Sequence, residues 1–433
     1  MLAFLASIDV SALLFGSLLL LLILGVPIAH ALGAATLLLV YSQGIPAVFV
    51  PQTTFNTSDS FPLVAVPFFV LAGYFMEYGG LSQRLVDFAS ALIGHVTGGF
   101  ACVTILACMF FAAMSGSGPA TVAAIGTLMI PAMIKVGYDR PFAAAVSSTG
   151  GTLGIMIPPS NPMIIYGVVG NVSVTQLFMA GIVPGILTGL VLLLGSWWLC
   201  RRYGFAGSAE RPTAARLGRT MWEARWALMA PVVILGGIYG GICTPTEASV
   251  IAAAYGLFVG LFVYRLLTWR KIYQALFNSV MVGGTVTIIV GLASGFGRLL
   301  TQYQIPQHLT EAVLSLSDNW FVVLMIINVG LIIIGTFMET LATIVLLTPI
   351  LLPVVVALGV DPIHFGILLV ITSEIGFLTP PLGVNLFVAM GIAKVTLEQI
   401  TRAVIPFLWM LLAMTVVLTA FPAISLWLPK LLR

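Results

Sequence analysis

Long apolar runs, separated by a few short polar or proline-rich segments, dominate the pattern of this chain. Runs of this length are typical of helices that cross a lipid bilayer. Two shorter segments, at 81–94 and 305–317, carry charge on one face and are too polar to span, so we expect them at the membrane interface. The expected spanning helices lie near 8–43, 61–78, 228–268 and 274–300, with long closing helices at Gln176–Trp198 and Ala403–Leu426.

Two of the apolar runs are interrupted in the same way. Each contains a Pro-Pro step, at Pro158-Pro159 and at Pro380-Pro381. Proline removes a backbone donor and clashes with the preceding turn, so a helix opens at such a step. A membrane tolerates an opened backbone only where it lines a cavity or is buried in protein, and paired breaks indicate a transporter's binding site. We therefore predict broken helices at about 141–170 and about 362–392.

A short polar segment interrupts the apolar run that precedes each broken helix. These segments are MSGSGPAT at about 114–121 and FMETLAT at about 337–343. Either flank can form a complete span, or the two flanks can form a re-entrant hairpin whose tip lies in the middle of the membrane. The flanks are somewhat short for full spans, which favours the hairpin.

Several prolines, glycines and aspartates recur at a constant spacing in the two halves of the chain. One shift aligns Pro131 with Pro353, Gly137 with Gly359, Asp139 with Asp361, Gly154 with Gly376 and Pro158 with Pro380. The chain therefore divides into two repeats, residues 1–200 and 227–433, joined by a connecting loop at 201–226. If each repeat crosses the membrane an odd number of times, the two are inverted. We predict an all-α polytopic membrane protein of two inverted-topology repeats, each with a re-entrant helical hairpin and a broken helix.

Composition and charge agree with a membrane protein. Hydrophobic residues make up 60% of the 433 positions and charged residues 7%, far below the roughly 25% of soluble domains. Six of the 17 Lys and Arg lie between Arg201 and Arg225, so the positive-inside rule predicts that the connecting loop is cytoplasmic. The net charge of +3 gives no indication of nucleic-acid binding.

Oxygen-bearing side chains gather at the two tips and the two breaks. Carbonyl and hydroxyl oxygens suit a hard cation such as Na⁺, and opened helix N-termini suit a carboxylate. Hydroxyls in membrane helices often bond back to their own helix, but this concentration favours a functional role. The candidates are Ser115, Ser117, Thr121, Thr149, Thr152, Ser160 and Asn161, and then Thr336, Thr340, Thr343, Thr372, Ser373, Thr379 and Asn385. Those expected to contact substrate are Ser117, Thr121, Ser160, Asn161, Thr343 and Asn385.

Two carboxylates stand deep in apolar sequence, where ionisable groups indicate function. Glu339, at the second tip, either ligates a cation or caps the returning helix. Glu374, just before the second break, is either protonated or paired with Lys394 or a serine.

Other charged residues of the apolar segments stand near expected helix ends. Asp139 and Asp361 precede a proline at a helix start, which is an N-cap signal. Long side chains at helix ends can reach the membrane interface, as we expect for Glu77, Glu247 and Arg298.

Motifs of enzymes and of ATP-driven pumps are absent from the sequence. It contains neither GxxxxGK[ST] nor HExxH, and no nucleophile–base pair stands out. The ring of like charges or repeated filter loop of a channel is also missing. The four histidines, His30, His95, His308 and His364, lack ligand spacing, so we expect neither an enzyme nor a transition-metal site.

The tips and breaks resemble those of the large membrane subunit of tripartite ATP-independent periplasmic (TRAP) transporters. The resemblance runs nearly from end to end, with independent motifs in the right order. They are GVPIAHALG (25–33), VPFFVLAGYFM (66–76), SGSGPATVAAIGTLMIPAMIKVGYD (115–139), IPPSNPMIIYG (157–167), GGICTPTEA (240–248), FMETLATIVLLTPILLPV (337–354), EIGFLTPPLGVNLFVA (374–389) and FPAISLWLP (421–429).

The resemblance implies a Na⁺-coupled secondary importer that carries a small organic acid across the bacterial inner membrane by symport. The substrate would be a C4-dicarboxylate, a keto acid, or a sialic or sugar acid. A transport domain of hairpins and broken helices would move as an elevator against a scaffold of outer helices. The implied partners are a small four-helix membrane subunit, a soluble periplasmic substrate-binding protein and membrane lipids, with Na⁺ as coupling ion and no cofactor.

The family's ion sites lie between each hairpin tip and its broken helix. Carried over, the first site comprises Ser115, Gly116, Ser117, Gly118, Gly150, Gly151, Thr152 and Pro158, and the second comprises Thr336, Met338, Glu339, Thr372, Gly376, Thr379 and Pro381. Many members have Ser-Ser where this chain has Gly150-Gly151, which leaves backbone oxygens and Thr152 to coordinate at the first site. An alternative in the same physical class is a stand-alone Na⁺/dicarboxylate symporter without a binding protein.

Overall fold

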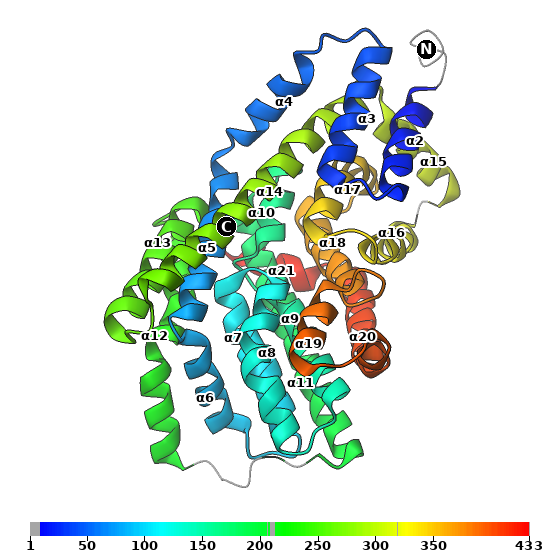
Figure 1. Ribbon diagram of the computed structural model, residues 1–433. Coiled ribbons are helices and arrows are strands. Elements are labelled where there is room, and N and C mark those ends of the chain that lie inside the picture. The colour runs from blue at the N-terminus through cyan, green and yellow to red at the C-terminus, as the bar shows by residue number, and fades with distance from the viewer. Residues whose placement is uncertain (1–8, 206, 208–212, 318, 433) are drawn as a thin grey trace.

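The first half of the chain is helical in the computed structural model, which describes residues 9–205, 207, 213–317 and 319–432 (Figure 1). Its helices are α2 (Val10–Ile23), α3 (Ile28–Ser42), α4 (Phe49–Ser58), the 3₁₀ turn η1 (Phe61–Val64), α5 (Ala65–Tyr78), α6 (Leu81–Ile93), α7 (Gly99–Ser115), α8 (Gly118–Lys135), α9 (Arg140–Met156), α10 (Asn161–Val169) and α11 (Val174–Tyr203).

The second half, described from residue 213 on, repeats much of this order. Its helices are α12 (Ala214–Tyr239), α13 (Pro245–Phe258), the π-helical turn η2 (Val259–Val263), α14 (Trp269–Gln302), α15 (Ile305–Leu316), α16 (Trp320–Gly335), α17 (Thr340–Ala357), α18 (Pro362–Phe377), α19 (Val384–Ala393), α20 (Leu397–Ala420) and α21 (Ala423–Leu431).

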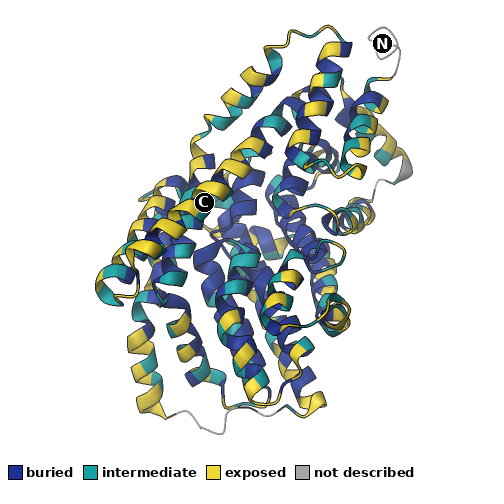
Figure 2. Ribbon diagram, viewed as in Figure 1, coloured by how far each residue is buried: buried dark blue, intermediate teal, exposed yellow. Residues whose placement is uncertain are grey.

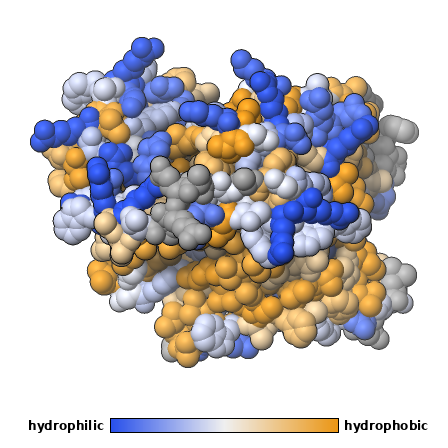
Figure 3. All heavy atoms as spheres, turned by 90° about the horizontal axis from the view of Figure 1, so that it is seen from below, coloured by the Kyte–Doolittle hydropathy of each residue, from blue (hydrophilic) through white to orange (hydrophobic). Residues whose placement is uncertain are grey.

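The expectation of an all-α polytopic membrane protein is confirmed. The described residues contain eight helices long and apolar enough to cross a membrane, and a ninth span if α9 and α10, bent by 41° at their break, count as one. Buried residues concentrate where the helices meet in the middle of the molecule (Figure 2). Seen from below, hydrophilic side chains gather on one part of the surface, and a broad hydrophobic area lies beside them (Figure 3). Such an area suits contact with lipid.

The tips and breaks fall where the proline and glycine pattern places them. α7 ends at Ser115 and α8 begins at Gly118, while α16 ends at Gly335 and α17 begins at Thr340. The four residues between α9 and α10 contain the Pro158-Pro159 step. Both Pro-Pro bonds are cis. The α7–α8 and α16–α17 pairs match the expected hairpins in position, and whether each turns back inside the membrane stays a prediction.

The range 201–226, expected to be a connecting loop, is helical at both of its ends. α11 continues to Tyr203, and α12 begins at Ala214; residues 206 and 208–212 lie outside the described residues. The hydroxyl of Thr213 accepts a hydrogen bond from the Arg216 amide, which caps α12 at its start. Arg219 and Glu223 form an ion pair at 2.9 Å one turn apart. These local contacts favour helix in a stretch whose polarity predicts a loop.

The closing helix expected at Ala403–Leu426 is interrupted. α20 ends at Ala420, and a separate helix, α21, begins at Ala423. Phe421 precedes Pro422 and has φ −123° and ψ 76°, which is outside the helical region. Proline disfavours helical backbone in the residue before it, so the chain turns at this point.

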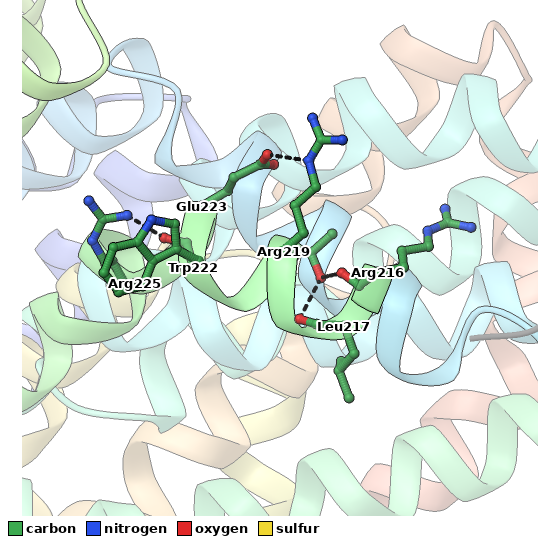
Figure 4. A network of polar contacts seen from close by, with 7 residues as sticks. Arg216, Leu217, Arg219, Trp222, Glu223 and Arg225 are labelled. Atoms are coloured by element: carbon green, nitrogen blue, oxygen red, sulfur yellow. Dashed lines mark hydrogen bonds and ion pairs between the residues drawn. The ribbon is translucent and has the colours of Figure 1, made fainter. Parts of the chain in front are cut away.

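Arginine side chains contact tryptophan rings of their own helix near the end of α11 and in the first turns of α12. Figure 4 shows the first turns of α12, where Arg225 donates to the Trp222 carbonyl at 2.6 Å. The Arg225 guanidinium also lies 4.0 Å from the Trp222 ring centroid. Arg202 lies 5.7 Å from the ring of Trp198 near the end of α11. Such amphipathic side chains are typical of a membrane interface, and that this end is cytoplasmic stays a prediction.

A cysteine introduced at Ala215 tests the orientation. Ala215 is exposed at the start of α12, and Ala47 is exposed in the loop between α3 and α4 at the opposite end of the molecule (Figure 1). Labelling of intact cells with an impermeant thiol reagent should modify Ala47→Cys and leave Ala215→Cys unmodified until the membrane is opened. The reverse pattern would show that the positive-inside assignment is wrong for this chain.

Candidate functional site

The first tip brings three of the predicted oxygen ligands together. The Ser115 and Thr121 hydroxyls lie 2.8 Å apart, and Thr121 donates to the Ser117 carbonyl at 2.9 Å. Beyond the break, the backbone N–H of Asn161 donates to the Gly116 carbonyl at 3.2 Å. The tip is therefore fixed to the start of α10, and its buried oxygens form a compact group with the chemistry of a Na⁺ site.

The second tip shows equivalent contacts. Thr343 donates to the Glu339 carbonyl at 3.0 Å, one turn into α17. The Leu382 amide, beyond the second break, donates to the Thr336 carbonyl at 2.9 Å. In both halves a backbone N–H after the Pro-Pro step thus donates to a carbonyl of the preceding tip.

In each half, one glycine of the broken helix allows a close approach to the segment that contains the tip. A Cβ on Gly154 would lie 2.5 Å from both the Ser117 carbonyl oxygen and the Thr121 hydroxyl. A Cβ on Gly376 would lie 2.5 Å from the carbonyl carbon of Gly335. Real Cβ atoms do not approach other atoms this closely, so only glycine fits at either position.

Other predicted ligands bond back to their own helices. Thr152 donates to the Thr149 carbonyl at 2.7 Å, Thr372 to Leu368 at 2.7 Å, and Thr379 to Ile375 at 3.0 Å. These hydroxyl protons are committed within the helix, while the oxygen of each hydroxyl retains a free lone pair.

Gly150 and Gly151 face different neighbours. A Cβ on Gly151 would lie 3.1 Å from the Gly118 carbonyl, so this residue contacts the tip. A Cβ on Gly150 would instead lie 2.8 Å from the sulfur of Cys108 on α7. The two residues stay predicted members of the first ion site, and only Gly151 contacts the tip in this way.

Glu374 has partners other than those expected. Its carboxylate accepts from the Asn385 amide nitrogen at 2.7 Å and from the Thr340 hydroxyl at 3.4 Å, rather than from Lys394 or a serine. Glu374 is 1% exposed, and its Oε1 lies against the Cα of Gly118 at the start of α8. A carboxylate of the second half therefore contacts the tip of the first, at the positive end of a helix.

The caps agree in part with the sequence signals. Asp361 accepts from the Ile363 amide at 2.8 Å, whereas Asp139 stands at the N-cap position of α9 without a side-chain cap bond. Glu339 likewise makes no side-chain cap bond at the start of α17. Of its two expected roles, capping the returning helix is therefore not seen, and ligation of a cation stays a prediction. Glu247 forms a capping box with Thr244, a local role that accounts for its position at a helix end.

A cavity of about 500 Å³ opens between α5, α14 and the two tips. Of the residues expected to contact substrate, Ser117 and Asn161 line it, whereas Thr121, Ser160, Thr343 and Asn385 are buried and are not among its lining residues. Ser160 instead caps α10 by accepting from the Met163 amide at 3.5 Å. The lining also includes Glu77, Glu339 and Glu374.

Glu77 lines the cavity, although the sequence does not predict it as a site residue. It stands in the last turn of α5, next to Tyr74 and Tyr78, and we expected it to reach the membrane interface. The sequence does contain an indication of this role, because an ionisable group in an apolar segment often has a function. Arg298, for which we expected the same, lines a separate cavity of about 620 Å³ that contains none of the predicted site residues.

The architecture is similar to that of solved transporter structures. The Alcanivorax borkumensis YdaH transporter superposes with a TM-score of 0.64 over 88% of each chain, at 15% identity. Neisseria gonorrhoeae MtrF superposes with a TM-score of 0.61 over 86% of this chain and 84% of that one, at 14% identity. At such low identity the likeness establishes the fold alone.

Sequence relatives extend over nearly the whole chain. The isethionate TRAP transporter permease protein DctMQ of Oleidesulfovibrio alaskensis is 49% identical over 97% of this chain and 66% of its own length. The C4-dicarboxylate TRAP transporter large permease protein DctM of Rhodobacter capsulatus is 40% identical over 97% and 99%. The sialic acid TRAP transporter large permease protein SiaM of Vibrio cholerae is 38% identical over 95% and 96%.

The helical fold, its apolar spans and its paired breaks define a multi-pass membrane permease. The family model described as Tripartite ATP-independent periplasmic transporter, DctM component, matches residues 15–424. The chain belongs to this family, which confirms the resemblance seen in the tips and breaks. Its relatives are transporter permeases and not enzymes, as expected.

Proposed function

We propose that this chain is the large permease subunit of a Na⁺-coupled importer of a small organic acid in the bacterial inner membrane. Its partners are a small four-helix membrane subunit and a soluble periplasmic binding protein that delivers the substrate. Family membership over residues 15–424 supports this proposal. Relatives named for C4-dicarboxylates, sialic acid, 2,3-diketo-L-gulonate and isethionate support the substrate class, since all four are organic acids. Membership does not favour the stand-alone symporter.

The single observation that carries the proposal is the paired construction of the tips. The bonds from Thr121 to the Ser117 carbonyl and from Thr343 to the Glu339 carbonyl are equivalent in the two halves, at 2.9 and 3.0 Å. This equivalence supports two inverted repeats, each with one Na⁺ site between its tip and its broken helix. Oxygen atoms without a nearby cationic side chain are suitable ligands for a monovalent cation.

The arrangement of the helices supports an elevator motion. The long helix α14 packs against α3, α4 and α5, and α13 packs against α5 and α12. In Figure 1 α3 and α4 lie above α7, α8, α9 and α19, and α12 and α13 lie to their left. The helices packed around α13 and α14 would form the scaffold, and α7, α8, α9 and α19, with the tips and breaks, would carry substrate and Na⁺ together.

Uptake into proteoliposomes tests the coupling. Vesicles with both membrane subunits and the binding protein should accumulate a labelled organic acid when Na⁺ is higher outside. Succinate, isethionate and N-acetylneuraminate are suitable probes. Equal uptake in K⁺ or choline medium would contradict Na⁺ coupling, and full uptake without the binding protein would favour the stand-alone symporter.

Ser115→Ala measures the first ion site directly. It removes one buried hydroxyl of the tip and should raise the half-saturating Na⁺ concentration roughly tenfold, since a lost contact to a charged group costs about 1–3 kcal/mol. Ser249→Ala is the matched control, because Ser249 is also buried but bonds only to the Thr246 carbonyl within α13. An unchanged Na⁺ dependence in Ser115→Ala would exclude this hydroxyl as a ligand.

A further inference from the structure

A third cavity, also of about 500 Å³, lies where α9 begins, α11 ends and α20 begins. Its lining contains none of the residues predicted for the ion sites or the substrate site. Two arginines line it, Arg140 in the first turn of α9 and Arg402 in the second turn of α20. These helices belong to different halves of the chain, so the fold brings together two cations that are far apart in the sequence.

Both arginines are available to a ligand. Arg140 is exposed and has no ion-pair partner among the described residues, where the pairs are Arg219–Glu223 and Arg402–Glu398. The pair of Arg402 with Glu398, at 2.6 Å, is exposed on both sides, and such pairs contribute little to stability. A guanidinium has five N–H donors, so Arg402 can also contact a second anion. Arginine is well suited to bind phosphate oxygens.

The charge of this cavity suits a ligand with one negative charge. Two arginines and one aspartate, Asp139, line it, which leaves one positive charge over. Arg201 and Arg202 at the end of α11 add positive charge nearby and outweigh Glu398, which lies outside the lining. Asp139 makes no side-chain cap bond at the start of α9, so its carboxylate can accept from a ligand hydroxyl.

The remaining lining of the cavity is largely apolar. The ring of Phe142 lies 5.7 Å from that of Tyr203 and 6.1 Å from that of Phe407, measured between centroids. Phe142 and Tyr203 both line the cavity, together with Pro141, Ala403 and Pro406. Charged groups beside an apolar wall suit an amphipathic ligand better than a small hydrated ion.

An exposed apolar stripe continues from Arg402 along α20. Ile405 and Trp409 are exposed, and they follow Arg402 by three and seven residues, so all three side chains lie on one face of the helix. α20 is long and apolar enough to cross a membrane. An acyl chain that lies along this stripe places its headgroup at the cavity.

We propose that this cavity binds the headgroup of an anionic phospholipid that carries hydroxyl groups, namely phosphatidylglycerol. The phosphate would contact Arg140 and Arg402, a glycerol hydroxyl would donate to Asp139, and an acyl chain would lie against Ile405 and Trp409. A zwitterionic headgroup would leave the positive charge of the lining unbalanced. The site goes beyond the proposed function, because it takes neither substrate nor Na⁺.

Lipid titration of the purified full-length chain in detergent tests the assignment. Native mass spectrometry gives the Kd for dioleoyl lipids that differ only in their headgroup. Phosphatidylglycerol should bind with a Kd at least about tenfold lower than phosphatidylethanolamine, which corresponds to one charge-assisted contact. Phosphatidylmethanol has the same charge but no diol, and it should bind roughly fivefold more weakly than phosphatidylglycerol, as for one lost hydrogen bond.

Variants of the lining separate the two parts of the headgroup. Arg140→Gln and Arg402→Gln should each raise the Kd for phosphatidylglycerol about tenfold. Asp139→Ala should remove the preference over phosphatidylmethanol. Arg219→Gln is the matched control for Arg402→Gln, because both side chains are exposed, at 80% and 77%, and pair with a glutamate one turn away, and Arg219 lies outside the cavity. Thermal unfolding verifies that each variant is folded.

Four outcomes would overturn the proposal. Equal Kd values for phosphatidylglycerol and phosphatidylethanolamine would show that the cavity does not select charge. Unchanged binding in both Arg140→Gln and Arg402→Gln would place the lipid elsewhere, and an equal loss in Arg219→Gln would indicate general attraction to a basic surface. Glycerol 3-phosphate that binds as tightly as the lipid would assign the cavity to a soluble anion. Na⁺-driven uptake is measured separately, so none of these results bears on the proposed function.

Discussion

Replacement of Gly376 by alanine is expected to abolish substrate uptake. The added Cβ would lie 2.5 Å from the carbonyl carbon of Gly335 and 2.6 Å from its Cα. Both are backbone atoms, so no side-chain rotation relieves the overlap, and α18 must move away from the end of α16. Overpacking usually costs about 1–3 kcal/mol and costs more where the backbone must shift. Uptake and thermal unfolding of the purified chain measure the two consequences.

Gly391→Ala provides the control for this substitution. Gly391 lies in α19, just after the same break, and a Cβ there would meet nothing within 4 Å. It should therefore transport as wild type and unfold at the same temperature or slightly higher, since alanine favours helix. Wild-type uptake by Gly376→Ala would mean that the contact between α16 and α18 is not needed at any step of transport.

The positions of the tips and breaks follow from local chemistry and were therefore predictable. Proline and glycine act on the backbone of their own turn, so Pro158-Pro159 and Pro380-Pro381 mark broken helices whatever surrounds them. The order of elements follows from the length of each apolar run. The tip residues Ser115, Ser117 and Thr121 come together for the same reason, since they are neighbours along the chain.

The features that depend on packing between distant segments were not predictable in this way. Glu77 stands in the last turn of an apolar helix, and only the approach of α14 and the two tips turns that position into a cavity wall. Glu374 bonds to Asn385 and Thr340, although a charge pattern alone favours Lys394. Whether Gly150 faces Cys108 or the tip depends on how α9 is rotated against α7.

The contact between Glu374 and the first tip links the two halves of the site. Its Oε1 accepts from Asn385 and lies against Gly118, while its Oε2 accepts from Thr340. One carboxylate thus connects the starts of α8 and α17 with α19. Because Glu374 is almost fully buried, loss of this carboxylate leaves buried donors on two helices without an acceptor.

We expect Glu374→Ala to be severely destabilising and Glu374→Gln to be folded. Alanine leaves the Asn385 amide and the Thr340 hydroxyl unpaired, and each unsatisfied buried group costs about 1–3 kcal/mol. Glutamine preserves the volume and one acceptor for Asn385, and its amide nitrogen can donate to the Thr340 oxygen. Thermal unfolding should therefore place Glu374→Gln close to wild type and Glu374→Ala well below it.

The same pair of variants separates structure from charge in transport. If the carboxylate serves only to join the two tips, Glu374→Gln transports at the wild-type rate. If its negative charge balances a cation in the cavity, Glu374→Gln folds normally but loses most of its uptake. We expect this second result because no lysine or arginine is among the residues that line the cavity with Glu374. Glu398→Gln controls for the loss of one carboxylate, because Glu398 forms an exposed pair with Arg402 that contributes little to stability. Full uptake by Glu374→Gln would restrict Glu374 to a structural role.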